Sequence, residues 1–267
     1  MRYFFHIAYH GTRYNGWQKL PHNTSVQHVI ETQLSNVVKL PVTIVGCGRT
    51  DSRVHASQYF FHADLPTISI SELLFRLNKM LPDDIAVFDI LPVDDQAHAR
   101  LSAIERTYTY YLHRSKDPFL NIVSALYPHN FDLSVIKKAL TLLPTHNDYR
   151  FFHRTASHPK TTICHVTHAK LFVDESGDRL KFIISANRFL SGMVRIIVHR
   201  LLQAGRQKLT ITQFEDYLNG TQTPANIKSA HPQGLYLSRV KYPFIELPVK
   251  SKFDLFVDKG SRWQEVD

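Results

Sequence analysis

The sequence contains few of the residues on which secreted, fibrous or disordered proteins depend. Its 267 residues include two cysteines, Cys47 and Cys164, which are too few for a disulfide framework. Ten glycines and 13 prolines, without a short repeat, exclude a collagen-like or low-complexity chain. No run of about 18 apolar residues predicts a membrane-spanning helix, and residues 1–4 do not resemble the start of a secretory leader. We therefore expect a globular protein of the reducing cytoplasm.

Acidic residues are scarce relative to basic ones, and the imbalance is confined to one part of the chain. There are 32 Lys and Arg against 23 Asp and Glu, a formal charge of +9. Residues 1–104 hold nine of each sign, whereas residues 105–267 hold 23 basic and 14 acidic residues. One-sided charge is typical of a protein that binds a polyanion, because basic side chains displace the counterions of phosphates. A basic, well-solvated surface is the alternative, and charge alone does not decide.

Several motifs for nucleotide or metal chemistry are missing. The sequence has no glycine-rich phosphate loop, dinucleotide fingerprint or serine elbow. Cys164, His165 and His168 form the best local metal candidate, but strand alternation would send the two histidines to opposite faces. The pairs Asp83-Asp84 and Asp94-Asp95 could suggest a two-metal nuclease, but both lie beside prolines, where solvated turn residues are the favoured interpretation. We therefore expect neither a metal nor a cofactor.

Hydrophobic periodicity predicts an α+β chain with a repeated pattern. In residues 1–104 it predicts strands at 2–10, 41–45, 54–62 and 85–92, with helices at 25–38 and 70–81. Thr24 and Gln27 fit a capping box for the first helix. This order of strand, helix, strand, strand, helix, strand is typical of a ferredoxin-like half.

The pattern begins again in residues 105–267. Strands are predicted at 106–113, 160–173, 180–187 and 234–240, and helices at 132–143, 188–204 and 211–219. We therefore predict two related ferredoxin-like or RRM-like halves with mixed, mainly antiparallel sheets, divided between residues 104 and 105.

The predicted helix 188–204 carries one polar face. Arg188, Gly192, Arg195 and His199 recur on it at helical spacing, and a solvated face is the ordinary interpretation. Glycine inside a helix costs about 1 kcal/mol relative to alanine, so Gly192 suggests the close approach of a ligand or another backbone.

The stretch Gly46–Ala56 concentrates small, charged and hydroxyl residues between two β-rich runs. Asp51 is its only carboxylate, and Arg49 and Arg53 stand two residues to either side. Loops held between strands often carry reactive groups. The residues alone leave two interpretations open: a reactive aspartate, or a turn aspartate neutralised by an arginine.

Tyr108, Tyr110 and Tyr111 follow Arg106 on a predicted strand of the basic half. Tyrosines in such a strand usually pack in the core. Their place in the basic half keeps a second interpretation open, in which one of them stacks on an RNA base.

Five motifs, in this order, resemble those of tRNA pseudouridine synthases of the TruA family. They are Tyr9–Gly11 and Tyr14–Gln18 with Ser25–Gln27; Gly48–Asp51 with Val54–Ala56; Arg106–Tyr110; Phe189–Leu190 with Met193–Arg195; and Pro232 with Gly234–Leu237, Val240 and Tyr242-Pro243. Each motif is short, but their order and spacing cover nearly the whole chain.

The resemblance implies isomerisation of uridine to pseudouridine in tRNA, usually in the anticodon stem-loop, without metal or cofactor. By position, Asp51 is the catalytic aspartate, either as a covalent nucleophile or as the base that removes a sugar proton. Tyr108 packs on the target base, Arg195 pairs with Asp51, and Arg49 helps to displace the target nucleotide. The resemblance also implies a basic central cleft between the two halves and a homodimer that holds tRNA across both subunits.

The chain departs from the family pattern at three places. Ser52-Arg53 stands where a small residue and a glycine are usual, Ser191-Gly192 replaces an aromatic–histidine pair, and His10 replaces a common aspartate. Two alternatives therefore remain: a synthase for a different RNA site, or a tRNA-binding chaperone that has lost catalysis.

Overall fold

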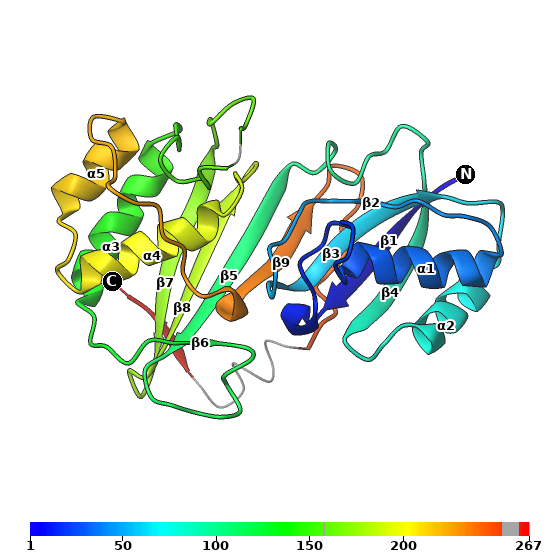
Figure 1. Ribbon diagram of the computed structural model, residues 1–267, viewed down its shortest axis with the longest axis horizontal. Coiled ribbons are helices and arrows are strands. Elements are labelled where there is room, and N and C mark those ends of the chain that lie inside the picture. Colours follow the sequence, from blue (N-terminus) through cyan, green and yellow to red (C-terminus); the bar gives the residue numbers. More distant parts are fainter. Residues whose placement is uncertain (157, 253–261, 267) are drawn as a thin grey trace. The chain divides into compact units, whose positions relative to one another are not determined.

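A computed structural model describes residues 1–156, 158–252 and 262–266. The chain divides into two compact units: unit 1 holds residues 1–104 and 236–253, and unit 2 holds residues 105–235 and 254–267. Each unit combines helices with a mainly antiparallel sheet (Figure 1), which confirms the predicted α+β class. The chain thus leaves unit 1 after residue 104 and returns to it at residue 236.

Unit 1 is built on a sheet in which β1 is central. Its elements are β1 (Arg2–Tyr9), the 3-10 turn η1 (Gly11–Arg13), α1 (Val26–Val38), β2 (Val45–Gly46), β3 (His55–Asp64), α2 (Ile70–Met80), β4 (Ile85–Val93) and β9 (Leu235–Lys241). Strand β1 pairs antiparallel with β3 and β4, and the short β2 pairs with β3. Strand β9 pairs with the start of β3 in parallel, through Tyr236 and Leu237.

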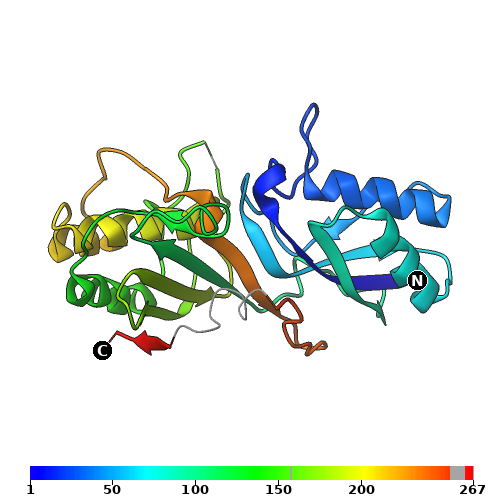
Figure 2. The same ribbon diagram turned by 90° about the horizontal axis from the view of Figure 1, so that it is seen from below.

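Both faces of the unit 1 sheet are covered. Helices α1 and α2 lie on one face, and the segment that follows β9 lies on the other (Figure 2). In that segment, the rings of Tyr242 and Phe244 pack on Phe4 at centroid distances of 5.4 and 5.7 Å. The side-chain amide of Gln58 donates to the Leu247 carbonyl at 3.3 Å. Because successive strand side chains point to opposite faces, coverage of both explains why residues 3–7 of β1 are all buried.

In unit 2, helices lie on one face of a mainly antiparallel set of strands (Figure 1). Its elements are β5 (Glu105–His113), β6 (Ala125–Leu126), α3 (Leu133–Leu142), the 3-10 turn η2 (Leu143–Thr145), β7 (Val166–Asp174), β8 (Arg179–Ala186), α4 (Met193–Gly205), α5 (Ile211–Asn219), the 3-10 turn η3 (Pro232–Gly234) and β10 (Trp263–Glu265). The antiparallel order is β10, β7, β8, β5, and β6 joins β5 in parallel.

Most predicted elements are present, with differences at their ends. The capping box predicted for α1 is wrong: Ser25 caps the helix by accepting the His28 N–H at 3.2 Å, while the Gln27 amide donates to Glu31. The strand predicted at 160–173 begins only at Val166, and the one predicted at 41–45 is reduced to β2. Across the described ranges, the helices are all too short or too polar to span a membrane.

Candidate active site

The loop that carries Asp51 is fixed first by β3. The Cys47 N–H donates to the Phe60 carbonyl at 2.8 Å, continuing the pairing of β2 with β3. The Tyr59 hydroxyl donates to the Gly48 carbonyl at 2.6 Å. The first half of the loop therefore follows β3 closely.

The residue before Asp51 is fixed by the N-terminal loop of the same unit. The Thr50 hydroxyl lies 2.8 Å from the Tyr9 hydroxyl, and its carbonyl accepts the Trp17 N–H at 3.2 Å. Gly16 has φ +89°, and a Cβ there would lie 2.4 Å from the Thr50 carbonyl oxygen. Only glycine allows this approach, which explains why a glycine precedes Trp17 in the segment that packs against the Asp51 loop.

A tight turn follows Asp51. The Val54 N–H donates to the Asp51 carbonyl at 3.2 Å, and the Arg53 N–H donates to the Tyr14 carbonyl at 3.1 Å. Arg53 has φ +64°, in the left-handed region that favours glycine at this position of a turn. The structure describes all of residues 46–56, and among them only Arg53 has a positive φ. The departure from the family pattern at Ser52-Arg53 therefore places a non-glycine residue at the one left-handed position of the loop.

Two exposed guanidinium groups flank the aspartate. Asp51 is half-buried, whereas Arg49 and Arg53 are exposed. Within residues 1–156, 158–252 and 262–266, neither arginine side chain forms a hydrogen bond or an ion pair. Guanidinium groups presented in this way suit phosphate oxygens, which accept their N–H groups in pairs.

Two histidines pack beside the loop. The Gly11 N–H donates to His55 Nδ1 at 3.0 Å, so the neutral ring carries its proton on Nε2. His55 stacks on Tyr236 at 4.5 Å and lies 4.3 Å from the ring of His10. Burial lowers the pKa of His10, with Asp84 opposing the shift. His10 is thus a neutral packing group where the family pattern has an aspartate.

Asp84 anchors the segment after β1. Its carboxylate accepts the Tyr14 hydroxyl in a short hydrogen bond and pairs with Arg13 Nε at 3.1 Å. Asp84 lies in a turn, as predicted, but its side chain is 14% exposed and has two partners, so its interpretation as a solvated residue is wrong. Asp94 does act as a turn residue, since it accepts the Gln96 N–H at 2.8 Å.

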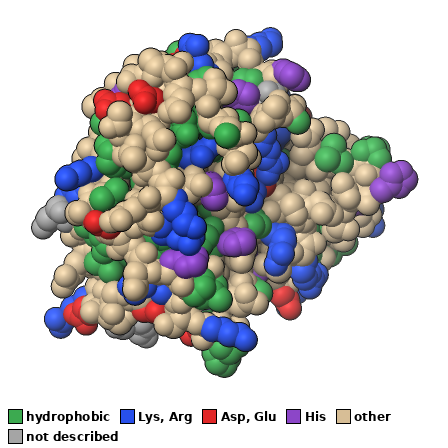
Figure 3. Space-filling view, turned by 60° about the vertical axis from the view of Figure 1, so that its left-hand side comes forward, with side chains coloured by type: hydrophobic (Ala, Val, Ile, Leu, Met, Phe, Trp, Pro, Cys, Tyr) green, Lys and Arg blue, Asp and Glu red, His purple; other side chains and the backbone are tan. Residues whose placement is uncertain are grey.

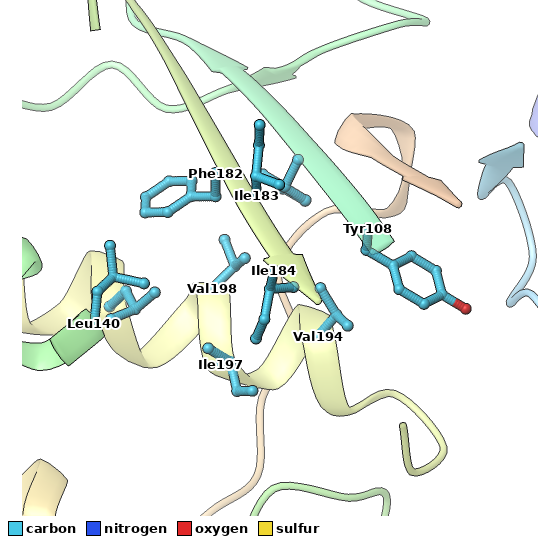
Figure 4. A pocket seen from close by; sticks show the side chains of 10 residues that line it. Tyr108, Leu140, Phe182, Ile183, Ile184, Val194, Ile197 and Val198 are labelled. Atoms are coloured by element: carbon cyan, nitrogen blue, oxygen red, sulfur yellow. The ribbon is translucent and has the colours of Figure 1, made fainter. Parts of the chain in front are cut away.

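Tyr108 is the fourth residue of β5 in unit 2. Its ring meets the edge of Phe189 at 5.1 Å and is half-buried. Figure 4 shows the Tyr108 ring pointing away from the apolar side chains that line a small cavity between β8 and α4. Tyr110 and Tyr111 are 1% and 3% exposed, as expected for core tyrosines.

Arg195 lies in the first turn of α4, which begins later than predicted. Gly192 has φ +72° and cannot belong to a right-handed helix, so the helix starts at Met193. The predicted polar face is wrong for Arg188 and Gly192, which precede the helix. Periodicity missed this boundary because apolar residues continue at helical spacing through a loop. Gly192 provides a left-handed residue before the first turn.

A segment that the sequence did not single out holds Arg195. Arg195 Nε donates to the Ala230 carbonyl at 2.7 Å, and the Ala230 N–H donates to the Arg195 carbonyl at 2.9 Å. The Arg200 guanidinium, 5% exposed, donates to the Asn226 carbonyl of the same segment. Backbone carbonyls have no residue signature, so this contact leaves no sequence signal.

The structure thus places Arg49 and Asp51 on one loop of unit 1 and Tyr108 and Arg195 in unit 2. The pairing of Arg195 with Asp51 stays a prediction.

Cys164, His165 and His168, the local metal candidate in the sequence, do not lie on one strand. His165 precedes β7, so the assumption that it shares a strand with His168 is wrong, and its Nδ1 lies 3.0 Å from Asn147 Oδ1. Cys164 is buried, and burial raises the pKa of its thiol to about 11. In the part of the chain that the structure describes, no three His, Cys, Asp or Glu side chains are grouped to hold a metal ion.

Positive charge belongs to both units. Unit 1 has 13 basic and 10 acidic residues, because residues 236–253 add four basic side chains and one acidic one. Unit 2 has 19 basic and 13 acidic residues. On the face in Figure 3, Lys, Arg and His side chains are widely spread with few acidic ones among them.

Comparisons with known proteins agree on one family. Residues 141–243 match a family model described as tRNA pseudouridine synthase. The tRNA pseudouridine synthase A of Porphyromonas gingivalis is 42% identical, over 91% of this chain and 97% of the relative. The enzyme of the same name from Parabacteroides distasonis is 38% identical, over 93% of this chain and 99% of the relative. That of Bacteroides thetaiotaomicron is 37% identical, over 97% of this chain and 98% of the relative.

Proposed function

Because this chain belongs to the tRNA pseudouridine synthase family, we propose that it isomerises uridine to pseudouridine in the anticodon stem-loop of tRNA, in the cytoplasm. The observation that carries the proposal is the Gly46–Ala56 loop. Its half-buried Asp51 has a backbone fixed on both sides and an exposed arginine two residues away in each direction. A carboxylate that must meet one atom of a nucleoside requires such fixed geometry.

The reaction exchanges one bond of the base for another. The bond from N1 to the sugar C1′ breaks, the base turns, and C5 forms a new bond to C1′. A proton leaves C5 and another is taken up at N1, so substrate and product are isomers and no electrons are exchanged. Asp51 either attacks C1′ or removes a sugar proton, and both routes need the carboxylate to be held against the sugar.

The target base must leave its stack before it can react, at a cost of roughly a few kcal/mol. Arg49, exposed on the same loop, takes part in displacing the nucleotide. Tyr108, half-buried, packs on the extruded base, and Arg195 pairs with Asp51. The excess of basic residues in both units supplies contacts to the tRNA phosphates.

We further propose that two copies form a homodimer that binds tRNA. The support is the family to which the chain belongs; large apolar side chains are also exposed, among them Leu101 and Phe119 at 79% and 82%. Light scattering of the purified protein tests this directly. A single-chain mass at micromolar concentration would contradict it.

Pseudouridine mapping on tRNA transcripts tests the main proposal. The wild type should convert defined uridines of the anticodon stem-loop, and Asp51→Ala should convert none while binding tRNA with similar affinity. Asp83→Ala removes an exposed carboxylate of the same unit and serves as the matched control. If the Asp51→Ala variant still converted uridine, Asp51 would not be the catalytic residue. Tight, salt-sensitive binding without any conversion by the wild type would favour the chaperone.

A further inference from the structure

Two tyrosines hold the segment to which Arg195 is bonded. The Tyr110 hydroxyl donates to the His231 carbonyl at 2.9 Å. The His231 N–H donates to the Tyr127 hydroxyl at 3.0 Å, and the Tyr127 and His231 rings lie 5.2 Å apart. The His231 residue is therefore fixed through both of its backbone polar groups.

The neighbouring residue, Ala230, passes this constraint to Arg195. Ala230 and Arg195 exchange two hydrogen bonds, one between backbone atoms and one from Arg195 Nε. A guanidinium is planar, so a bond at Nε fixes the direction in which its remaining N–H groups point. The orientation of Arg195 thus depends on where the peptide between residues 230 and 231 lies.

Tyr110 also belongs to the strand that carries Tyr108. Residues two apart on a strand share a face, so Tyr108 and Tyr110 project from the same side of β5. Tyr110 is 1% exposed, and burial raises the pKa of both Tyr110 and Tyr127. Their hydroxyls therefore stay protonated at neutral pH, as the hydrogen bond from Tyr110 to the carbonyl requires.

We propose that Tyr110 and Tyr127 are positioning residues: their hydroxyls fix the His231 backbone, and through Ala230 they set the orientation of Arg195 relative to the strand that presents Tyr108. The proposal rests on the function proposed above, in which Arg195 pairs with the catalytic aspartate. It assigns a role to two hydroxyl groups that touch neither the substrate nor Asp51.

The test uses Tyr110→Phe and Tyr127→Phe in the full chain, since phenylalanine keeps the ring and removes only the hydroxyl. With saturating tRNA, each variant should lower the rate of uridine conversion about tenfold, because small displacements of reacting groups are costly. Affinity for tRNA should stay within about twofold, since no phosphate contact is lost.

Tyr149→Phe is the matched control. Tyr149 is a fully buried tyrosine of the same unit, whose hydroxyl donates to the Leu143 carbonyl at 2.6 Å. This variant also loses one buried hydrogen bond, but the bond does not lead to Arg195. It should lose thermal stability to a similar extent and keep its rate of conversion.

A double-mutant cycle with Arg195→Ala separates positioning from general damage. If the tyrosines act through Arg195, Tyr110→Phe should have no further effect on the rate in the Arg195→Ala background. If the double variant instead lost rate by the product of the two single losses, the inference would be overturned. Rates equal to that of the wild type in both Tyr110→Phe and Tyr127→Phe would also overturn it. A wild type that converts no uridine would overturn the proposed function and this inference together.

Discussion

Tyr9 and Thr50 are joined through their hydroxyl groups, 2.8 Å apart, and Thr50 directly precedes Asp51. The contact connects the last residue of β1, a strand that pairs on both sides in unit 1, to the loop that carries Asp51. Tyr9 is 4% exposed and Thr50 is 8% exposed, so water does not readily replace the contact. The position of Asp51 therefore depends on a strand that is about forty residues away in the sequence.

Removing this contact should affect both stability and rate. Tyr9→Phe is expected to lower the free energy of unfolding by about 1 kcal/mol, the usual worth of one buried hydrogen bond. The rate of uridine conversion should fall several-fold because Thr50 is less firmly held. Urea unfolding and single-turnover assays measure the two effects. Tyr3→Phe, on the same strand and 2% exposed, is the control; equal losses of rate in both variants would contradict the prediction.

Replacing Arg53 should separate backbone strain from charge. Arg53→Gly is expected to raise the free energy of unfolding by about 0.5–1 kcal/mol, because φ +64° is unfavourable for a residue with a Cβ. Arg53→Ala keeps the Cβ and should give no such gain. Both variants should bind tRNA more weakly, with a salt dependence reduced by about one counterion. Unchanged salt dependence would show that Arg53 does not contact phosphate.

Gly16 and Gly48 give a matched pair of glycine substitutions near the loop. Gly16→Ala combines a positive φ with a Cβ only 2.4 Å from the Thr50 carbonyl, and should destabilise unit 1 by about 2 kcal/mol or more. A Cβ at Gly48 meets no atom within 4 Å, so Gly48→Ala should leave stability nearly unchanged. Thermal unfolding compares them, and a similar loss in both would refute the assigned contact.

Acidification should destabilise unit 1 through His62. Burial, assisted by Arg2 and His98 and opposed by Asp64, lowers the pKa of His62 to about 4. Its Nδ1 also accepts the Ala99 N–H at 3.1 Å, which requires an unprotonated nitrogen. The unfolded chain takes up the proton near pH 6.5 and the folded chain only near pH 4. Stability should therefore fall as pH decreases between these values, by on the order of 1 kcal/mol from this residue.

His62→Gln tests this prediction because glutamine retains an acceptor and does not titrate. Urea unfolding at pH 7.5 and pH 5 should give a smaller difference for the variant than for the wild type. Equal differences would exclude His62 as a source of the pH dependence.

Local signals in the sequence predicted those parts of the structure that are determined locally. Helix α5 was predicted at its observed bounds. The structure shows that local features fix both ends: Thr210 and Gln213 form a capping box, and Gly220 ends the helix with a positive φ. Asp51 could be singled out because a lone carboxylate between two arginines is visible in the sequence. The start of α4 could not, because periodicity does not report the left-handed conformation of Gly192.

The contacts that hold the site residues in place could not be predicted from the sequence. Ala230 acts through its backbone, and any residue type offers the same carbonyl and N–H groups. The packing of residues 242–252 was likewise not predicted, because a short segment interrupted by two prolines gives no periodic signal.

The return of the chain to unit 1 has a consequence for biosynthesis. Residues 1–104 leave the ribosome before residues 105–235, and most of β9 and the segment that covers Phe4 follow only after those 131 residues. Until then, residues 1–104 lack β9, the strand that pairs in parallel with β3, and expose aromatic side chains such as Phe4 that the finished protein buries. Such intermediates are prone to aggregate. The N-terminal part of unit 1 can therefore complete its fold only after the whole of residues 105–235 has been synthesised.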